Sequence, residues 1–119
     1  MIGNPSTYYL ETIDQLNSEL ESWRQSIPPD CRPGQTFQAH KVHEMLQGDA
    51  ARQVIIWTHY FYSGVRIMLA RATLQLATNV DRLVPSSQQA ECKTLVMKES
   101  RSILELTKYI DAEPWAPLW

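Results

Sequence analysis

The sequence is poor in the residues that build phosphate-binding loops and metal centres. It has only four glycines, at positions 3, 34, 48 and 64, and they form no glycine-rich loop that could cradle a phosphate. Its two cysteines, Cys31 and Cys92, form no C-x-x-C motif and are too few for a disulfide framework. We therefore expect each cysteine to be a buried, small hydrophobic residue.

Long apolar runs are missing as well. The longest stretch without Lys, Arg, Asp or Glu lies around Val54–Val65, contains several polar residues and is closed by Arg66. It is too short to span a membrane. The first five residues have neither the charged region nor the apolar region of a signal peptide. We expect an intracellular, reduced protein that makes no contact with a membrane.

The chain also lacks an excess of basic charge. It has 11 Lys and Arg residues against 13 Asp and Glu residues, and its formal net charge is −2. Nucleic-acid-binding domains usually present a basic surface, so we expect no direct nucleic-acid contact. The charge is distributed unevenly along the chain. Residues 1–30 hold five acidic residues and one basic residue, Arg24, whereas residues 52–82 hold four arginines and one acidic residue, Asp81. This asymmetry predicts attraction between the first and third helical segments.

The main pattern in the sequence is a helical spacing of apolar residues. An apolar stripe predicts a first helix that begins in the capping stretch of residues 4–7 and ends at Pro28-Pro29, where proline removes the backbone donor. A loop follows at residues 28–35, and a short helix is predicted from residue 35 or 36 to Leu46, ended by Gly48. The stripe of the first helix consists of Leu10, Ile13, Leu16, Leu20 and Trp23.

A long helix is predicted over about residues 50–78, with Asp49 as its N-cap. It is apolar nearly all round, which is typical of a helix that other helices surround. Gly64 in its middle costs about 1 kcal/mol relative to alanine, so we expect a neighbouring backbone to cross closely there. One face of this helix is formed by Val54, Trp57, Phe61, Val65, Met68, Leu69, Ala72 and Leu76.

The last helix is predicted from Ser86 or Ser87 to about Asp111, and the tail after it, residues 113–119, is aromatic. The fold class is therefore all-α: three long helices plus one short helix in an antiparallel bundle. Residues 1–119 form a single domain or a fragment of a larger helical one, and the apolar tail predicts docking on a partner or self-association. On or near the inner face of the last helix lie Cys92, Val96, Ile103, Leu106 and Ile110.

No constellation of catalytic or metal-binding residues is visible. His40 and His43 share one helical face at a spacing that metals can use, but a third ligand would have to come from elsewhere. A solvated polar face explains the pair. Glu19 and Glu21 point to different sides of a helix and cannot act as paired carboxylates. We expect no catalytic, metal-binding or cofactor-binding residues, and therefore no enzyme.

Arg66 and Arg71 lie in the helix expected to be the most buried, where an unpaired guanidinium is costly. Either they reach the surface or pair with Glu19 and Glu21 of the first helix, or one of them holds an anionic small-molecule effector. The neighbouring rings are interpreted as core, although such rings also line ligand pockets. These rings are Trp57, Tyr60, Phe61 and Tyr62.

Several segments resemble a known family in their order. Leu20–Pro28, followed by Cys31-Arg32-Pro33-Gly34, resembles the L-x-x-W-x-x-x-L-P segment in the middle homology region of fungal zinc-cluster transcription factors. Further segments, Trp57–Tyr62, Ile67–Leu74 and Ser100–Leu106, are similar to later parts of that region, so the resemblance extends from Leu16 to Ile110. The family's Arg-Pro pair reads Arg71-Ala72 here, and Cys92 lies too far upstream of Ile103 to match its cysteine.

The resemblance implies a nuclear protein of a fungus and a helical regulatory module that responds to metabolites or partner proteins. The family's six-cysteine cluster and basic linker are absent from this sequence, so the segment would not read DNA itself. A generic helical interaction or oligomerisation module is the main alternative. A third is an enzyme or cofactor binder that uses the His40/His43 face or the arginines.

Overall fold

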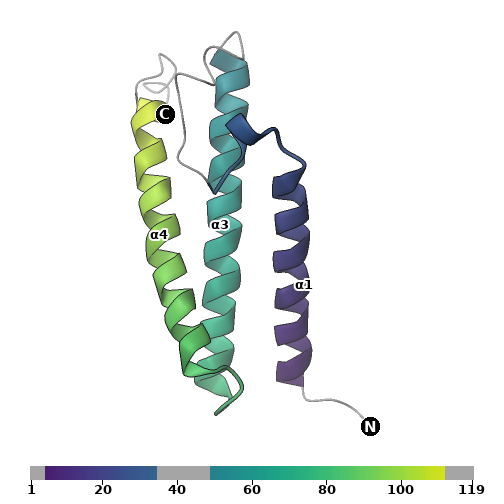
Figure 1. Ribbon diagram of the computed structural model, residues 1–119. Coiled ribbons are helices and arrows are strands. Elements are labelled where there is room, and N and C mark those ends of the chain that lie inside the picture. The colour runs from purple at the N-terminus through teal and green to yellow at the C-terminus, as the bar shows by residue number, and fades with distance from the viewer. Residues whose placement is uncertain (1–4, 35–48, 112–119) are drawn as a thin grey trace.

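The computed structural model describes residues 5–34 and 49–111, without the side chains of residues 30, 49–52 and 108–111. Its elements are α1 (Pro5–Gln25), a 3₁₀ turn η1 (Pro29–Cys31), α3 (Asp49–Asn79) and α4 (Ser86–Asp111), and no strand occurs in these ranges. The predicted all-α class is confirmed. Figure 1 shows α3 between α1 and α4. The short helix predicted near residues 35–48, His40, His43 and the aromatic tail lie outside the described residues.

The helix ends follow from local chemistry. Proline is favoured in the first turn of a helix, and α1 begins at Pro5. It ends at Gln25, shortly before Pro28-Pro29, and Arg32 then supplies donors to carbonyl groups at this end. The Arg32 Nη2 donates to the carbonyl oxygens of Ile27 at 3.0 Å and Gln25 at 3.3 Å. These bonds satisfy acceptors that a helix end leaves without intrahelical partners.

The α3–α4 interface pairs residues whose numbers rise on one helix and fall on the other. Arg66 lies opposite Glu99, and Thr73 lies within hydrogen-bonding reach of Cys92. The two helices therefore run in opposite directions, joined by a connection of six residues. Ile56 is completely buried, and it belongs to the described core with Ile13, Leu20, Cys31, Tyr62, Ala70, Val84 and Leu106.

Helix α1 packs on α3 through fewer contacts. Ile13 and Leu20 are its only buried hydrophobic residues, and the Trp23 ring meets Phe61 edge-on with 5.4 Å between the ring centroids. The loop after α1 adds polar bonds. The Arg24 Nε donates to the Pro33 carbonyl oxygen at 2.7 Å, and the His59 Nε2 lies 3.0 Å from the Cys31 carbonyl oxygen. This loop therefore fastens the end of α1 to α3.

Helix α3 corresponds to the predicted helix, but the prediction that other helices surround it is wrong. Among the residues expected to share a face, Val54, Trp57, Phe61 and Met68 are exposed. The opposite face is buried and includes His59, Ser63 and Thr73. The Thr73 Oγ1 donates to the Leu69 carbonyl oxygen and His59 bonds with the Cys31 carbonyl oxygen, so these two polar side chains are buried with hydrogen-bond partners.

The expectation for Gly64 is also wrong. A Cβ atom built at this position meets no atom within 4 Å among the described residues, so no backbone crosses there. The glycine that is sterically required is Gly34, whose φ of 88° lies in the left-handed region. A Cβ at Gly34 would lie 2.8 Å from the Arg24 Nε. The close approach therefore occurs in the loop that follows α1.

Candidate functional site

An exposed group of apolar side chains lies along one side of the α1–α3 interface. We call it the apolar strip, and it consists of Leu16 and Trp23 of α1 with Val54, Trp57, Phe61 and Met68 of α3. Trp23 is half-buried, and the exposed fractions of the other five side chains range from 44% for Leu16 to 70% for Met68.

Helical spacing aligns the residues of the strip. On α3 its members follow steps of three, four and seven residues, which place them on one face of the helix. The edge-on contact between Trp23 and Phe61 joins the contributions of the two helices. Soluble monomers rarely expose large contiguous apolar patches, and aromatic residues are enriched at the energetic centres of interfaces. The strip has the composition of a protein-binding surface.

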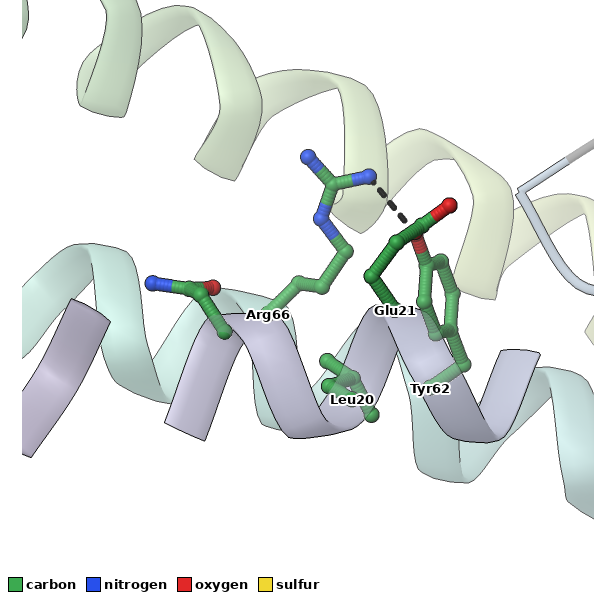
Figure 2. Close-up of a pocket in the computed structure, with 5 residues that line it drawn as sticks. Leu20, Glu21, Tyr62 and Arg66 are labelled. Carbon is green, nitrogen blue, oxygen red and sulfur yellow. Dashed lines mark hydrogen bonds between the residues drawn. The ribbon is translucent and has the colours of Figure 1, made fainter. Parts of the chain in front are cut away.

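A polar cleft lies on the other side of the same interface. Its volume is about 220 Å³, and it is lined by Asn17, Leu20 and Glu21 of α1 with Tyr62 and Arg66 of α3. Figure 2 shows Arg66, Tyr62 and Glu21 together in this region. Successive helical residues project about 100° apart, so Tyr62 and Arg66 point to a different side of α3 from Phe61 and Met68.

Arg66 is held in the cleft by three contacts. Its Nη1 donates to the Tyr62 hydroxyl at 2.9 Å and lies 3.5 Å from the Glu99 Oε1, and its guanidinium carbon is 5.4 Å from the centre of the Tyr62 ring. Only 2% of Glu99 is exposed. A buried carboxylate needs a charged partner, and Arg66 supplies it.

The prediction that Arg66 pairs with Glu19 or Glu21 is therefore wrong, because its ion pair is formed with Glu99 of α4. The sequence did not indicate Glu99 as the partner, because Glu99 lies on the otherwise apolar inner face of the last helix. Only the packing of α4 on α3 brings it next to Arg66. The electrostatic influence of Arg66 still reaches Glu21. This weaker effect agrees with the expected attraction between the first and third helical segments.

Glu21 lies at the exposed edge of the cleft. Its pKa is lowered chiefly by the hydrogen bond from Gln25. Burial opposes this effect, and the charges of Arg24 and Arg66 lower the pKa further. The Arg24 Nη1 forms an ion pair with the Glu21 Oε1 at 2.9 Å. Glu21 is therefore ionised at neutral pH.

The other predicted residues divide between core and surface. Arg71 is exposed, which agrees with one of the two structural alternatives, in which it reaches the surface. Of the four rings interpreted as core, only Tyr62 is buried, whereas Trp57 and Phe61 are exposed and Tyr60 is half-buried. Cys31 is buried as expected, but Cys92 is only half-buried. Burial and the nearby Glu91 carboxylate raise the pKa of the Cys92 thiol.

His59 is a buried residue whose role the sequence did not indicate. Burial lowers its pKa, and the hydrogen bond with the Cys31 carbonyl opposes that effect. A neutral imidazole with a proton on Nε2 donates this bond, so His59 fastens the loop after α1. The only sequence signal was a histidine within a strongly apolar helix.

A second hollow lies on α4. Its volume is about 320 Å³, and its described lining consists of Thr94, Met97, Lys98 and Arg101. These four residues all belong to α4, so among the described residues no second element contributes a side chain to this hollow. We therefore consider the cleft and the apolar strip the stronger candidates.

Within residues 5–34 and 49–111, no group of three or more His, Cys, Asp or Glu residues is arranged to hold a metal ion. Over the same part of the chain, no helix is sufficiently long and apolar to cross a membrane. No protein-family profile, curated protein or solved structure matches this chain.

Proposed function

We propose that this chain is a non-DNA-binding regulatory segment of a fungal zinc-cluster transcription factor, and that it acts in the nucleus without being an enzyme. In this proposal the segment belongs to a larger helical domain, an antiparallel bundle of three long helices and one short helix. The apolar strip is the observation on which the proposal depends, and the family motifs supply its biological context.

The proposed occupant of the strip is an amphipathic helix. A helix that lays its apolar side chains against the strip would bury Trp57, Phe61 and Met68 at once. Such a helix would come from the remainder of the regulatory domain or from a partner protein. A change in its position would transmit the regulatory signal, because binding shifts a protein between arrangements of different affinity.

A reporter assay in the longer protein tests this role. Met68→Lys places a charge in the strip, and Met97→Lys makes the same change on α4, where the methionine is also exposed. We expect Met68→Lys to change the transcriptional output several-fold and Met97→Lys to leave it unchanged. Equal output from both variants would contradict the proposal. A reading frame that lacks a basic six-cysteine segment upstream would contradict the family assignment.

A generic oligomerisation module is the second candidate, and the same strip favours it. In that case the occupant is a second copy of the chain, paired through the strip about a two-fold axis. Sedimentation of residues 1–119 should then show a dimer that Met68→Lys dissociates. A dilute monomer would exclude this second candidate and leave the first one standing.

A further inference from the structure

We infer that the polar cleft between α1 and α3 binds a small zwitterion of the α-amino acid type. In this arrangement Arg66 binds the ligand's carboxylate and Glu21 binds its ammonium group. The inference depends on how Arg66 is oriented, on the distribution of charge in the cleft and on the cleft's size.

Arg66 is oriented by groups behind it. Its Nη1 contacts both the Tyr62 hydroxyl and the buried Glu99 carboxylate, whereas no hydrogen bond within the described residues engages its Nη2 and Nε. Guanidinium groups bind carboxylates through two parallel N–H donors, and a fixed orientation favours that geometry. The Tyr62 hydroxyl accepts its bond from Arg66 and keeps its own proton for donation. The α3 side of the cleft is therefore suited to a carboxylate.

The α1 side of the cleft is suited to an ammonium group. Glu21 is ionised at neutral pH, because its hydrogen bond with Gln25 and the nearby arginines lower its pKa. Asn17 lies one helical turn earlier, on the same side of α1, and its amide oxygen is an additional acceptor. An ammonium group has three donors and no acceptor, and these two side chains match it.

The balance of charge distinguishes a zwitterion from a simple ion. Each cation around the cleft has an anionic partner, Arg24 with Glu21 and Arg66 with Glu99. A simple anion would gain from Arg66 but would be repelled by the two carboxylates, and a simple cation would be repelled by the two guanidinium groups. A ligand with both charges avoids each repulsion.

The size of the cleft is compatible with a small ligand. A volume of about 220 Å³ corresponds to roughly seven water molecules in the liquid. That space accommodates a small amino acid such as valine or threonine. Leu20 is the apolar residue of the lining and would contact the ligand's side chain.

Binding would also tie α1 to the α3–α4 pair, because the two halves of the site come from different helices. The apolar strip lies on the other side of that interface, so the ligand would favour one arrangement of the strip. This regulatory consequence rests on the proposed function. The binding step does not, because it involves only the cleft.

Calorimetric titration of residues 1–119 with L-valine tests the inference. Two matched compounds each lack one charge: 3-methylbutanoate lacks the ammonium group and 2-methylpropylamine lacks the carboxylate. We expect L-valine to bind saturably at one site and each analogue to bind at least tenfold more weakly. Binding of 3-methylbutanoate as tight as that of L-valine would overturn the zwitterion assignment. Failure of L-alanine, L-valine and L-threonine to bind saturably would overturn it too.

Variants on α1 locate the site without disturbing the core. Glu21→Gln removes the ammonium partner, and Glu19→Gln makes the same change on the same exposed helix outside the cleft lining. We expect Glu21→Gln to weaken valine binding at least tenfold and to strengthen 3-methylbutanoate binding, since one repelling carboxylate is gone. Glu19→Gln should leave both unchanged. Identical valine affinities for the two variants would overturn the site.

The strip variants separate this inference from the proposed function. Met68→Lys changes the apolar strip but no residue of the cleft lining, so valine affinity should be retained in it. If the wild-type chain does not bind L-valine, the inference about the cleft fails, whereas the proposed function, which the reporter assay tests, is unaffected. If Met68→Lys and Met97→Lys give equal reporter output, the proposed function fails, whereas the inference about the cleft, which the titration tests, is unaffected.

Discussion

The two helix interfaces of this protein differ in how completely they are closed. The α3–α4 interface buries the Glu99 carboxylate beside Arg66, and the six-residue connection keeps the two helices together. The α1–α3 interface buries only Ile13 and Leu20 from α1 and is bordered by a polar cleft and by the apolar strip. The difference indicates that α3 and α4 form the structural framework, and it is the reason why we propose α1 with α3 as the surface for recognition.

The largest expected effect concerns the framework. Arg66→Met leaves the Glu99 carboxylate buried without its partner, which should lower the free energy of unfolding by about 3 kcal/mol. Arg71→Met is the matched control, because Arg71 is exposed, and it should cost less than about 0.5 kcal/mol. Urea unfolding of both variants measures the difference.

A second variant separates a lost ion pair from lost packing. If the stranded charge is the cause, Arg66→Met combined with Glu99→Leu should recover most of the stability, since an apolar pair of similar volume replaces the buried ions. A double variant as unstable as the single one would show that the buried ion pair is not the source of the loss.

The next effect concerns the loop that fastens α1. Gly34→Ala forces a Cβ into a left-handed backbone and against Arg24, and we expect it to cost about 1–2 kcal/mol. Gly64→Ala has open space in the middle of α3 and should instead stabilise the protein by up to about 1 kcal/mol. Thermal unfolding of the pair should therefore show shifts of opposite sign. Shifts of the same sign would contradict the account of the loop.

A smaller effect is expected from pH. Burial lowers the pKa of His59 below its ordinary value of 6.5, so the unfolded chain binds this proton at a higher pH than the folded chain. The free energy of unfolding should fall as the pH drops through 6.5 and level off below the folded-state pKa. His59→Gln preserves a donor for the Cys31 carbonyl and should remove this part of the pH dependence. If the free energy of unfolding depends on pH in the same way in the wild type and in His59→Gln, His59 is not the source of this pH dependence.

Local signals predicted the helices well. Pro28-Pro29 indicated the end of α1, and Ser86 and Asp111 bound α4 as expected. The long helical periodicity predicted α3 to within one residue at each end. The ends and lengths of these helices depend on backbone donors, on capping residues and on the spacing of apolar residues. All three can be recognised from residues that are close together in the sequence.

Long-range features could not be predicted in the same way. The apolar face of α3 was expected to be covered, yet the described chain buries the opposite face around His59 and Ser63. Periodicity locates an apolar face but does not say what packs on it. The partner of Arg66 was missed for a similar reason, since Glu99 lies 33 residues away and meets it only through packing. The cleft was anticipated only as the alternative that an arginine binds an anionic effector.

Oxidative footprinting of methionines tests the central claim most directly. Met68 lies in the apolar strip and Met97 lies on α4, and their exposed fractions are 70% and 60%. Hydroxyl radicals should label both at similar rates in the isolated chain. In the longer protein to which we propose that it belongs, Met68 should be protected several-fold and Met97 should not. Equal labelling of Met68 in both contexts would contradict the claim that the strip is a binding surface for a further helix.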